Sequence, residues 1–98
     1  MGIIKGNQEN FDEVVSKGTV LVDFFAVWCG PCKMLAPELE KVSSKITVVK
    51  VDVDENLELS RRFGVMSVPT LVLFKDGKQV NMNIGYMPAE EIEKWVNA

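Results

Sequence analysis

Nearly continuous apolar runs alternate along the chain with segments whose apolar residues recur every three or four positions. The runs Val20–Ala26 and Ile46–Val53 are rich in β-branched residues, which is typical of strands buried on both faces. Thr70–Phe74 and Gln79–Ile84 predict two more strands, and the Asp76-Gly77 dipeptide between them is typical of a tight type I′ turn. These last two strands are therefore expected to run antiparallel.

Helical spacing of apolar residues predicts four helices in the remaining segments. Their expected caps or first residues are Asn7, Cys29, Asp54 or Asn56, and Pro88, the last at the first helical position. The second helix extends over Lys33–Lys45, and Pro37 removes a backbone donor within it, so we expect a kink there. Gly18 and Gly64 follow the first and third helices, where a glycine suits the left-handed backbone of a helix end.

The order of the predicted elements indicates the fold class. With a short edge strand at Ile3-Ile4, the order is βαβαβαββα. This alternation predicts an α/β fold in which helices cover both faces of a central sheet, and it leaves the strand order open. The chain has 98 residues and no linker or internal repeat, so we expect residues 1–98 to form a single domain.

Composition narrows the functional classes. The chain is 47% hydrophobic and 26% charged, and its net charge is −3, with Arg61-Arg62 as the only adjacent basic pair. We therefore expect no nucleic-acid partner. No apolar run approaches the roughly 20 residues that span a bilayer, and the N-terminal residues lack the pattern of a secretory signal. We expect a cytoplasmic protein without a membrane partner, in a reducing compartment where a cysteine pair is more often catalytic than structural.

Both cysteines lie in the pentapeptide Trp28–Cys32, where a predicted strand gives way to a predicted helix. Cys29 falls at the helix N-terminus, where backbone N–H groups without partners favour a thiolate and lower the thiol pKa. Cys32 follows three residues later, with its backbone N–H directed back toward the Cys29 sulfur. Gly30 permits a tight turn, and Pro31 fits the first helical turn, where its missing N–H costs nothing. This motif is typical of a redox centre.

Three other interpretations of the cysteine pair compete with the redox one. A structural disulfide that closes so short a loop would stabilise the fold by only about 2 kcal/mol, against about 3 kcal/mol for a loop of 15 residues. A zinc site needs about four ligands, and a chain without His or a third Cys supplies at most half of a site shared between chains. The third alternative, two buried and inert cysteines, stays open, but it does not explain why Trp28, Gly30 and Pro31 flank them. We expect no metal ion.

Asp23 is the most informative residue outside the pentapeptide. A carboxylate within the apolar strand Val20–Ala26 is costly to bury in its charged form, so burial should raise its pKa toward neutrality. Such a carboxyl can exchange a proton with Cys32, directly or through a water, when Cys32 becomes a nucleophile. The alternative is an aspartate at a strand end whose oxygens accept backbone N–H groups.

The segment Phe24–Lys33 resembles the active-site segment of the thioredoxin family, and the likeness extends over nearly the whole chain. The further matches are Asp23, Pro37, Lys50, Asp52, Val68-Pro69-Thr70, Phe74-Lys75-Asp76-Gly77 and Gly85. Two positions depart from the family pattern. Phe25 stands where the family usually has a second Trp, and Pro88 stands where it usually has a capping Ser or Thr. Neither departure touches the chemistry of the motif, although Phe25 is expected to alter the packing beneath it.

The resemblance implies a thioredoxin fold, with a mixed five-stranded sheet, four flanking helices, and the redox motif at the C-terminal end of a central strand. It implies that Asp23 is buried behind Cys32 with Lys50 nearby. It also implies that Pro69, an ordinary strand-opening proline by sequence, is cis and packs beside the disulfide, which leaves the Val68 backbone free to pair with an extended substrate. The substrate-docking residues implied are Trp28, Gly30, Pro31, Val68, Pro69 and Gly85.

Two functional hypotheses follow. The first is a protein disulfide reductase with Cys29, Cys32 and Asp23 as catalytic residues and a redox-active disulfide in place of any cofactor. Gly30-Pro31, without the His that stabilises the thiolate in more oxidising relatives, favours a reductant. The resemblance implies disulfide-containing protein substrates and a thioredoxin reductase as partners, leaves open whether that reductase is NADPH- or ferredoxin-linked, and implies a monomer. The second hypothesis is a binding module that uses this fold regardless of redox state.

Overall fold

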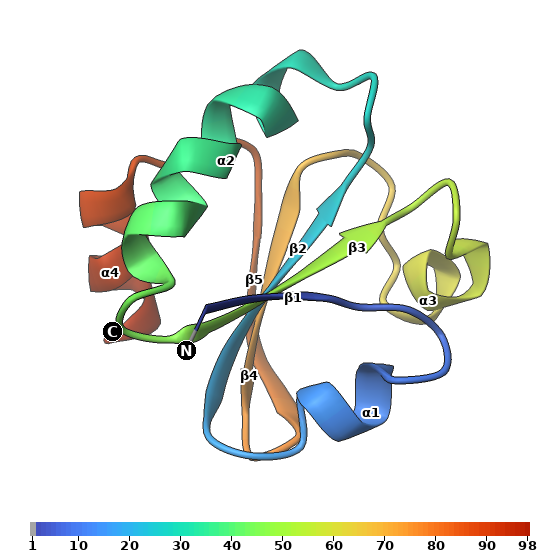
Figure 1. The fold of residues 1–98 in the computed structure, drawn as a ribbon, viewed down its shortest axis with the longest axis horizontal. Helices are drawn as coiled ribbons and strands as arrows, with labels where there is room; N and C mark the ends of the chain where they lie inside the picture. The colour runs from blue at the N-terminus through green and yellow to red at the C-terminus, as the bar shows by residue number, and fades with distance from the viewer. Residues whose placement is uncertain (1) are drawn as a thin grey trace.

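The computed structural model describes residues 2–98, which form a five-stranded sheet and four helices (Figure 1). The strands are β1 (Gly2–Lys5), β2 (Thr19–Phe25), β3 (Thr47–Asp52), β4 (Thr70–Lys75) and β5 (Lys78–Ile84). The helices are α1 (Phe11–Val14), α2 (Gly30–Val42), α3 (Leu57–Arg62) and α4 (Ala89–Val96). This element order confirms the prediction. Across residues 2–98, none of the helices has the length and apolar character needed to cross a membrane.

The sheet has the strand order β1-β3-β2-β4-β5, so β2 lies at its centre. β3 pairs in parallel with both β1 and β2, whereas β4 is antiparallel to β2 and to β5. The sheet is therefore mixed, as the resemblance implied. The C-terminal end of β2 leads directly into the loop that precedes α2 (Figure 1).

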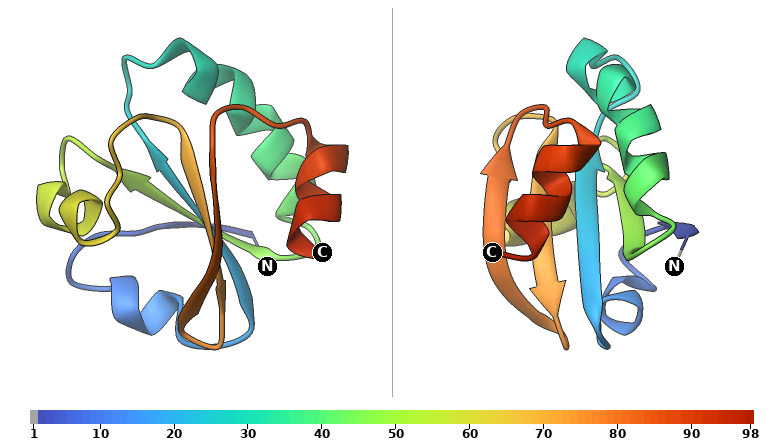
Figure 2. Two further views of the ribbon diagram at one scale, coloured as in Figure 1. Left: turned by 180° about the vertical axis from the view of Figure 1, so that it is seen from behind. Right: turned by 90° about the vertical axis from the view of Figure 1, so that its left-hand side faces the viewer.

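Helices cover both faces of the sheet, with α2 and α4 on one side and α1 and α3 on the other (Figure 2). Each side has its own apolar core. The core under α2 and α4 consists of Leu21, Leu35, Leu39, Val42, Val48, Leu71, Leu73, Met87, Ala89, Ile92 and Val96. The core under α1 and α3 consists of Phe11, Val15, Val20, Val22, Phe24, Val49, Val51, Leu59, Val72 and Phe74. Side chains of β2 enter both cores, which confirms the prediction of a strand buried on both faces.

The predicted hairpin is confirmed. Asp76 and Gly77 have φ angles of 49° and 84°, and two consecutive positive values are what a type I′ turn requires. β4 and β5 are antiparallel on either side of this turn.

The regular part of the first helix begins later than predicted. Its N-cap is Asn10. The side-chain oxygens of Asn7 and Asn10 accept hydrogen bonds from each other's backbone N–H, at 2.9 and 2.8 Å. The Phe11 N–H also donates to the Asn7 carbonyl at 3.0 Å, so these bonds form a capping box in the turn before α1. Asn7 thus caps this turn as predicted, and the regular helix starts after it, at Phe11.

The last helix also begins differently from the prediction. Pro88 has a φ of −70° and a ψ of 159°, so it is the extended N-cap of α4 and not the first helical residue. Proline has no side chain that could accept a bond from the helix, and Glu38 of α2 takes this role: its Oε1 accepts the Ala89 N–H at 2.9 Å. This bond is the main reason that the pKa of Glu38 is lowered, and Lys41 acts in the same direction. A carboxylate from a neighbouring helix thus replaces the capping Ser or Thr usual in the family.

Candidate active site

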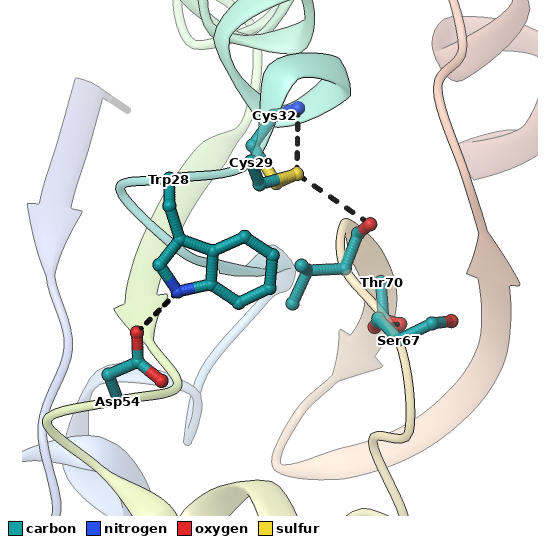
Figure 3. The surroundings of a disulfide bond; sticks show 7 residues. Trp28, Cys29, Cys32, Asp54, Ser67 and Thr70 are labelled. Atoms are coloured by element: carbon teal, nitrogen blue, oxygen red, sulfur yellow. Dashed lines mark hydrogen bonds between the residues drawn. A yellow bond between two sulfur atoms is a disulfide. The ribbon is translucent and has the colours of Figure 1, made fainter.

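Cys29 and Cys32 form a disulfide at the junction of β2 and α2 (Figure 3). Cys29 is the N-cap of α2, and its Sγ accepts a hydrogen bond from the Cys32 backbone N–H at 3.2 Å. The side chain thus takes the place that an oxygen takes at other helix N-termini, and it lies at the positive end of the helix dipole. Both cysteines are only 4% exposed, so burial does not distinguish them. They differ in position, because Cys29 is the N-cap of α2 and Cys32 lies within its first turn.

Trp28 lies beside the disulfide and is 67% exposed, which is unusual for so large an apolar side chain. Its indole Nε1–H donates a hydrogen bond to Oδ2 of Asp54 at 2.8 Å (Figure 3). Asp54 follows β3, and its own backbone N–H donates to Oδ1 of Asp52 at 2.9 Å. The indole orientation is therefore set by the loop after β3, a role for Asp54 that the sequence did not indicate.

The loop before β4 approaches the disulfide from the other side. The Val68-Pro69 peptide bond is cis, as the resemblance implied. The carbonyl oxygen of Val68 lies 3.7 Å from Sγ of Cys29. A disulfide sulfur carries no proton, so this is a contact in the oxidised protein and becomes a hydrogen bond only when Cys29 is a thiol. The loop is held by the Thr70 hydroxyl, which donates to the Ser67 carbonyl at 2.7 Å.

A groove of about 390 Å³ lies next to the disulfide. It is lined by Trp28, Val53, Val65, Met66, Ser67 and Val68. Trp28 and Val68 were expected at a docking surface. Met66 was not expected there, and the structure shows that it is 94% exposed. No periodic pattern points to Met66, because it lies in the irregular segment between α3 and β4.

The remaining residues of the expected docking surface lie around the disulfide but do not line this groove. Gly30 and Pro31 are exposed at the start of α2, whereas Pro69 is buried. Gly85 has a φ of 105°, and its N–H donates to the Pro69 carbonyl at 2.9 Å, so it lies directly beside the cis-proline loop. Gly85 thus adjoins the loop that contacts Cys29.

Asp23 lies in the middle of β2 and is fully buried. No hydrogen-bond partner for either carboxyl oxygen exists within residues 2–98, so the alternative of a carboxylate satisfied by backbone N–H groups was wrong. Burial raises the pKa of Asp23 to about 7, and the positive charge of Lys50 opposes this rise more weakly. Lys50 is the cross-strand neighbour of Asp23 on β3. The carboxyl is therefore poised to exchange a proton near neutral pH.

Metal ligands do not gather around the disulfide. In the part of the chain that the structure describes, no three His, Cys, Asp or Glu side chains are grouped so that they could hold a metal ion. The chemistry that the side chains at this site supply is that of the two sulfurs.

A reversible disulfide whose first cysteine caps the helix after a central strand defines the thiol-disulfide oxidoreductases of this fold. The family model for Thioredoxin matches residues 2–98. The chain belongs to the thioredoxin family, and it is a thiol-disulfide oxidoreductase.

Individual relatives agree with this assignment. Thioredoxin of Bacillus subtilis is 46% identical over 101 residues, which cover 99% of this chain and 97% of that protein. Thioredoxin of Listeria monocytogenes is 50% identical over 91 residues, covering 89% of this chain and 88% of that protein. Among solved structures, a mutant thioredoxin from Halobacterium salinarum is 40% identical, with a TM-score of 0.93, and the match covers 98% of this chain and 88% of that one. These matches confirm the predicted thioredoxin fold.

Proposed function

We propose that this protein reduces disulfides in other proteins, with Cys29 as the attacking cysteine and Cys32 as the resolving one. The Cys29 thiolate attacks one sulfur of the substrate disulfide, and the other substrate sulfur leaves as a thiolate. Cys32 then attacks Sγ of Cys29, which releases the second substrate sulfur and forms the Cys29–Cys32 disulfide. Two electrons pass from the cysteine pair to the substrate.

The single observation that carries this assignment is the hydrogen bond from the Cys32 N–H to Sγ of Cys29 at the N-cap of α2. It supports the charged form of Cys29 at the positive end of the helix. Cys32 lies within the first helical turn, and its own sulfur does not accept a bond from a backbone N–H within residues 2–98. Cys29 is therefore the better thiolate at neutral pH.

Asp23 is proposed as the proton acceptor for Cys32. Cys32 is buried and must lose its proton before it attacks Cys29. A carboxyl with a pKa of about 7 and no hydrogen-bond partner is suited to take that proton at neutral pH, directly or through a water. Lys50 supports this role by limiting how far the pKa rises.

The groove beside the disulfide is proposed to hold an extended segment of the substrate protein. Within residues 2–98, the Val68 N–H has no hydrogen-bond partner, and the Val68 carbonyl accepts no backbone hydrogen bond and lies 3.7 Å from Sγ of Cys29. Both groups are available for strand-like pairing with a substrate backbone. Trp28, Gly30, Pro31, Pro69 and Gly85 are proposed to supply an apolar contact area around this position.

The partners follow from the family. We infer that the substrates are disulfide-containing proteins, that a thioredoxin reductase regenerates the dithiol, and that no cofactor beyond the disulfide takes part. We further infer a cytoplasmic monomer formed by residues 1–98 as one domain, with no nucleic-acid or membrane partner.

Reduction of insulin disulfides with dithiothreitol as electron source tests the proposal. The wild-type protein should accelerate the reaction, and a Cys29→Ser/Cys32→Ser double variant should not. A double variant that retains full biological function, together with a wild-type protein that does not accelerate the assay, would favour a redox-independent binding module instead.

A further inference from the structure

The ring of Phe25 contacts two groups of different character. The Lys50 ammonium lies over this ring, with Nζ 4.5 Å from its centroid, a distance typical of a cation–π interaction. Phe25 also packs against the small cluster formed by Ala26, Cys29 and Cys32. One aromatic side chain therefore joins the lysine of β3 to the disulfide.

Lys50 contacts Phe25 and forms no ion pair with Asp23, although the two residues are cross-strand neighbours. Asp23 and Lys50 are paired across β2 and β3, so their side chains leave the sheet on the same face. Even so, within residues 2–98 no lysine or arginine forms a salt bridge with Asp23, and neither carboxyl oxygen accepts a hydrogen bond. Phe25 lies two residues beyond Asp23 on the same strand face, at the end of β2.

The other charged groups in this region have no resolved effect on the pKa of Asp23. From β4, the cross-strand neighbour of Asp23 is the apolar Leu71. From α2, Cys32 and Lys33 line a cavity of about 200 Å³ together with Phe25 and Lys50. On the outer side, Lys5, Asp52 and Glu55 line a groove that Phe25 and Lys50 also border. Of these charges, only that of Lys50 appreciably affects Asp23.

We propose that Phe25 is a positioning residue for the proposed proton transfer: its ring holds the Lys50 ammonium away from the Asp23 carboxyl and so keeps that carboxyl unpaired and available to Cys32. The inference rests on the proposed role of Asp23 as proton acceptor. If the ring were lost, the ammonium would move toward the carboxylate, stabilise its charged form and make it a weaker base. Phe25, which stands where the family usually has a Trp, would thus affect the proton transfer between Asp23 and Cys32 through Lys50.

Carboxyl carbon NMR of the oxidised protein tests the inference without any measurement of activity. Phe25→Leu should lower the pKa of Asp23, whereas Phe25→Tyr and Phe25→Trp, which keep a ring, should leave it near the wild-type value. Phe63→Leu is the matched control, because it removes a ring that contacts the Arg62 guanidinium at 4.9 Å far from the site. It should leave the titration of Asp23 unchanged.

Loss of the ring also loosens packing, and this effect alone would lower the pKa of Asp23 by admitting water. A double-mutant cycle separates the two causes. In a Lys50→Met background, Phe25→Leu should shift the titration of Asp23 much less than it does with Lys50 present. An equal shift in the two backgrounds would overturn the inference, since Phe25 would then act through packing alone.

Two further measurements do not depend on that cycle. In the wild-type protein, the terminal methylene protons of Lys50 should be shifted upfield by the ring, and ordinary values would overturn the inference even if Phe25→Leu failed to fold. In reductase assays of Phe25→Leu, the ratio of the rate at pH 6 to that at pH 8 should rise about two- to fivefold, from the energy typical of an exposed cation–π contact. An unchanged pH profile alongside a shifted Asp23 titration would instead contradict the proton-acceptor role of Asp23.

Discussion

Among single residues, Asp23 has the largest predicted effect on how stability depends on pH. Its folded pKa of about 7 lies above the ordinary value of 3.8, so the unfavourable contribution of its charge is absent below about pH 4 and grows until the pH passes 7. Asp23→Ala should therefore stabilise the oxidised protein more at pH 8 than at pH 4, by roughly 4 kcal/mol. Urea denaturation at the two pH values measures this difference.

The control for this experiment is Asp12→Asn. Asp12 is an exposed aspartate whose pKa is lowered, chiefly by its hydrogen bond from Arg62, so its removal should affect stability in the opposite sense. An Asp23→Ala variant that gains the same stability at pH 4 and pH 8 would show that the carboxyl is solvated or paired. It would also remove the basis for its role in proton transfer.

Asp54 is a second residue with a testable role, because it fixes the exposed indole of Trp28. Asp54→Ala should lower kcat/KM for protein disulfides about fivefold, mainly through KM, which corresponds to the loss of about 1 kcal/mol from one hydrogen bond. Steady-state kinetics with insulin checks this, and Glu55→Ala, an exposed neighbour on the same loop, is the control. An unchanged KM in Asp54→Ala would show that the free indole adopts the same orientation without its acceptor.

At the scale of elements, α2 and α4 are joined by a hydrogen bond in which Glu38 accepts the first N–H of α4. Because the pKa of Glu38 is lowered in the folded protein, its contribution to stability is present above its unfolded pKa of about 4.5 and is lost as the pH falls through the folded value. Glu38→Ala should lower the urea midpoint at pH 7 and lower it much less at pH 3. Glu40→Ala, on the same helix, is the control, and an equal loss at both pH values would contradict the capping role.

The same elements show which features the sequence predicts. Apolar periodicity was enough to locate the strands and helices, and the pentapeptide Trp28–Cys32 was enough to locate the site, because both patterns are local. The bonds from Ala89 to Glu38 and from Trp28 to Asp54 join residues 51 and 26 positions apart, and no local pattern encodes such pairs. The start of the first helix was predicted too early, because the capping bonds of Asn7 close a turn that precedes the regular helix.

At the scale of the whole molecule, the central sheet joins two apolar cores, and we expect them to unfold together. Phe11→Ala, in the core under α1 and α3, should cost about 3–5 kcal/mol, and Ile92→Ala, in the other core, about 2–5 kcal/mol. In both variants, far-UV circular dichroism and tryptophan fluorescence, which includes Trp95 beside the α2/α4 core, should report one common transition. Val80→Ala, at an exposed position of β5, is the control and should change stability by no more than about 0.5 kcal/mol.

A Phe11→Ala variant whose circular dichroism changes before its fluorescence would contradict this expectation. It would show that the two sides of the sheet unfold separately, and that residues 2–98 do not behave as one cooperative unit.

Trapping of mixed disulfides tests the roles of the two cysteines most directly. Each single variant, Cys29→Ser and Cys32→Ser, is reduced, incubated with a disulfide-containing protein such as insulin, and analysed by mass spectrometry without reducing agent. Cys32→Ser should accumulate a mixed disulfide through Cys29, because the resolving attack is lost, and Cys29→Ser should accumulate none. Accumulation with Cys29→Ser and not with Cys32→Ser would reverse the two roles and contradict the account of Cys29 as the thiolate stabilised by the N-terminus of α2.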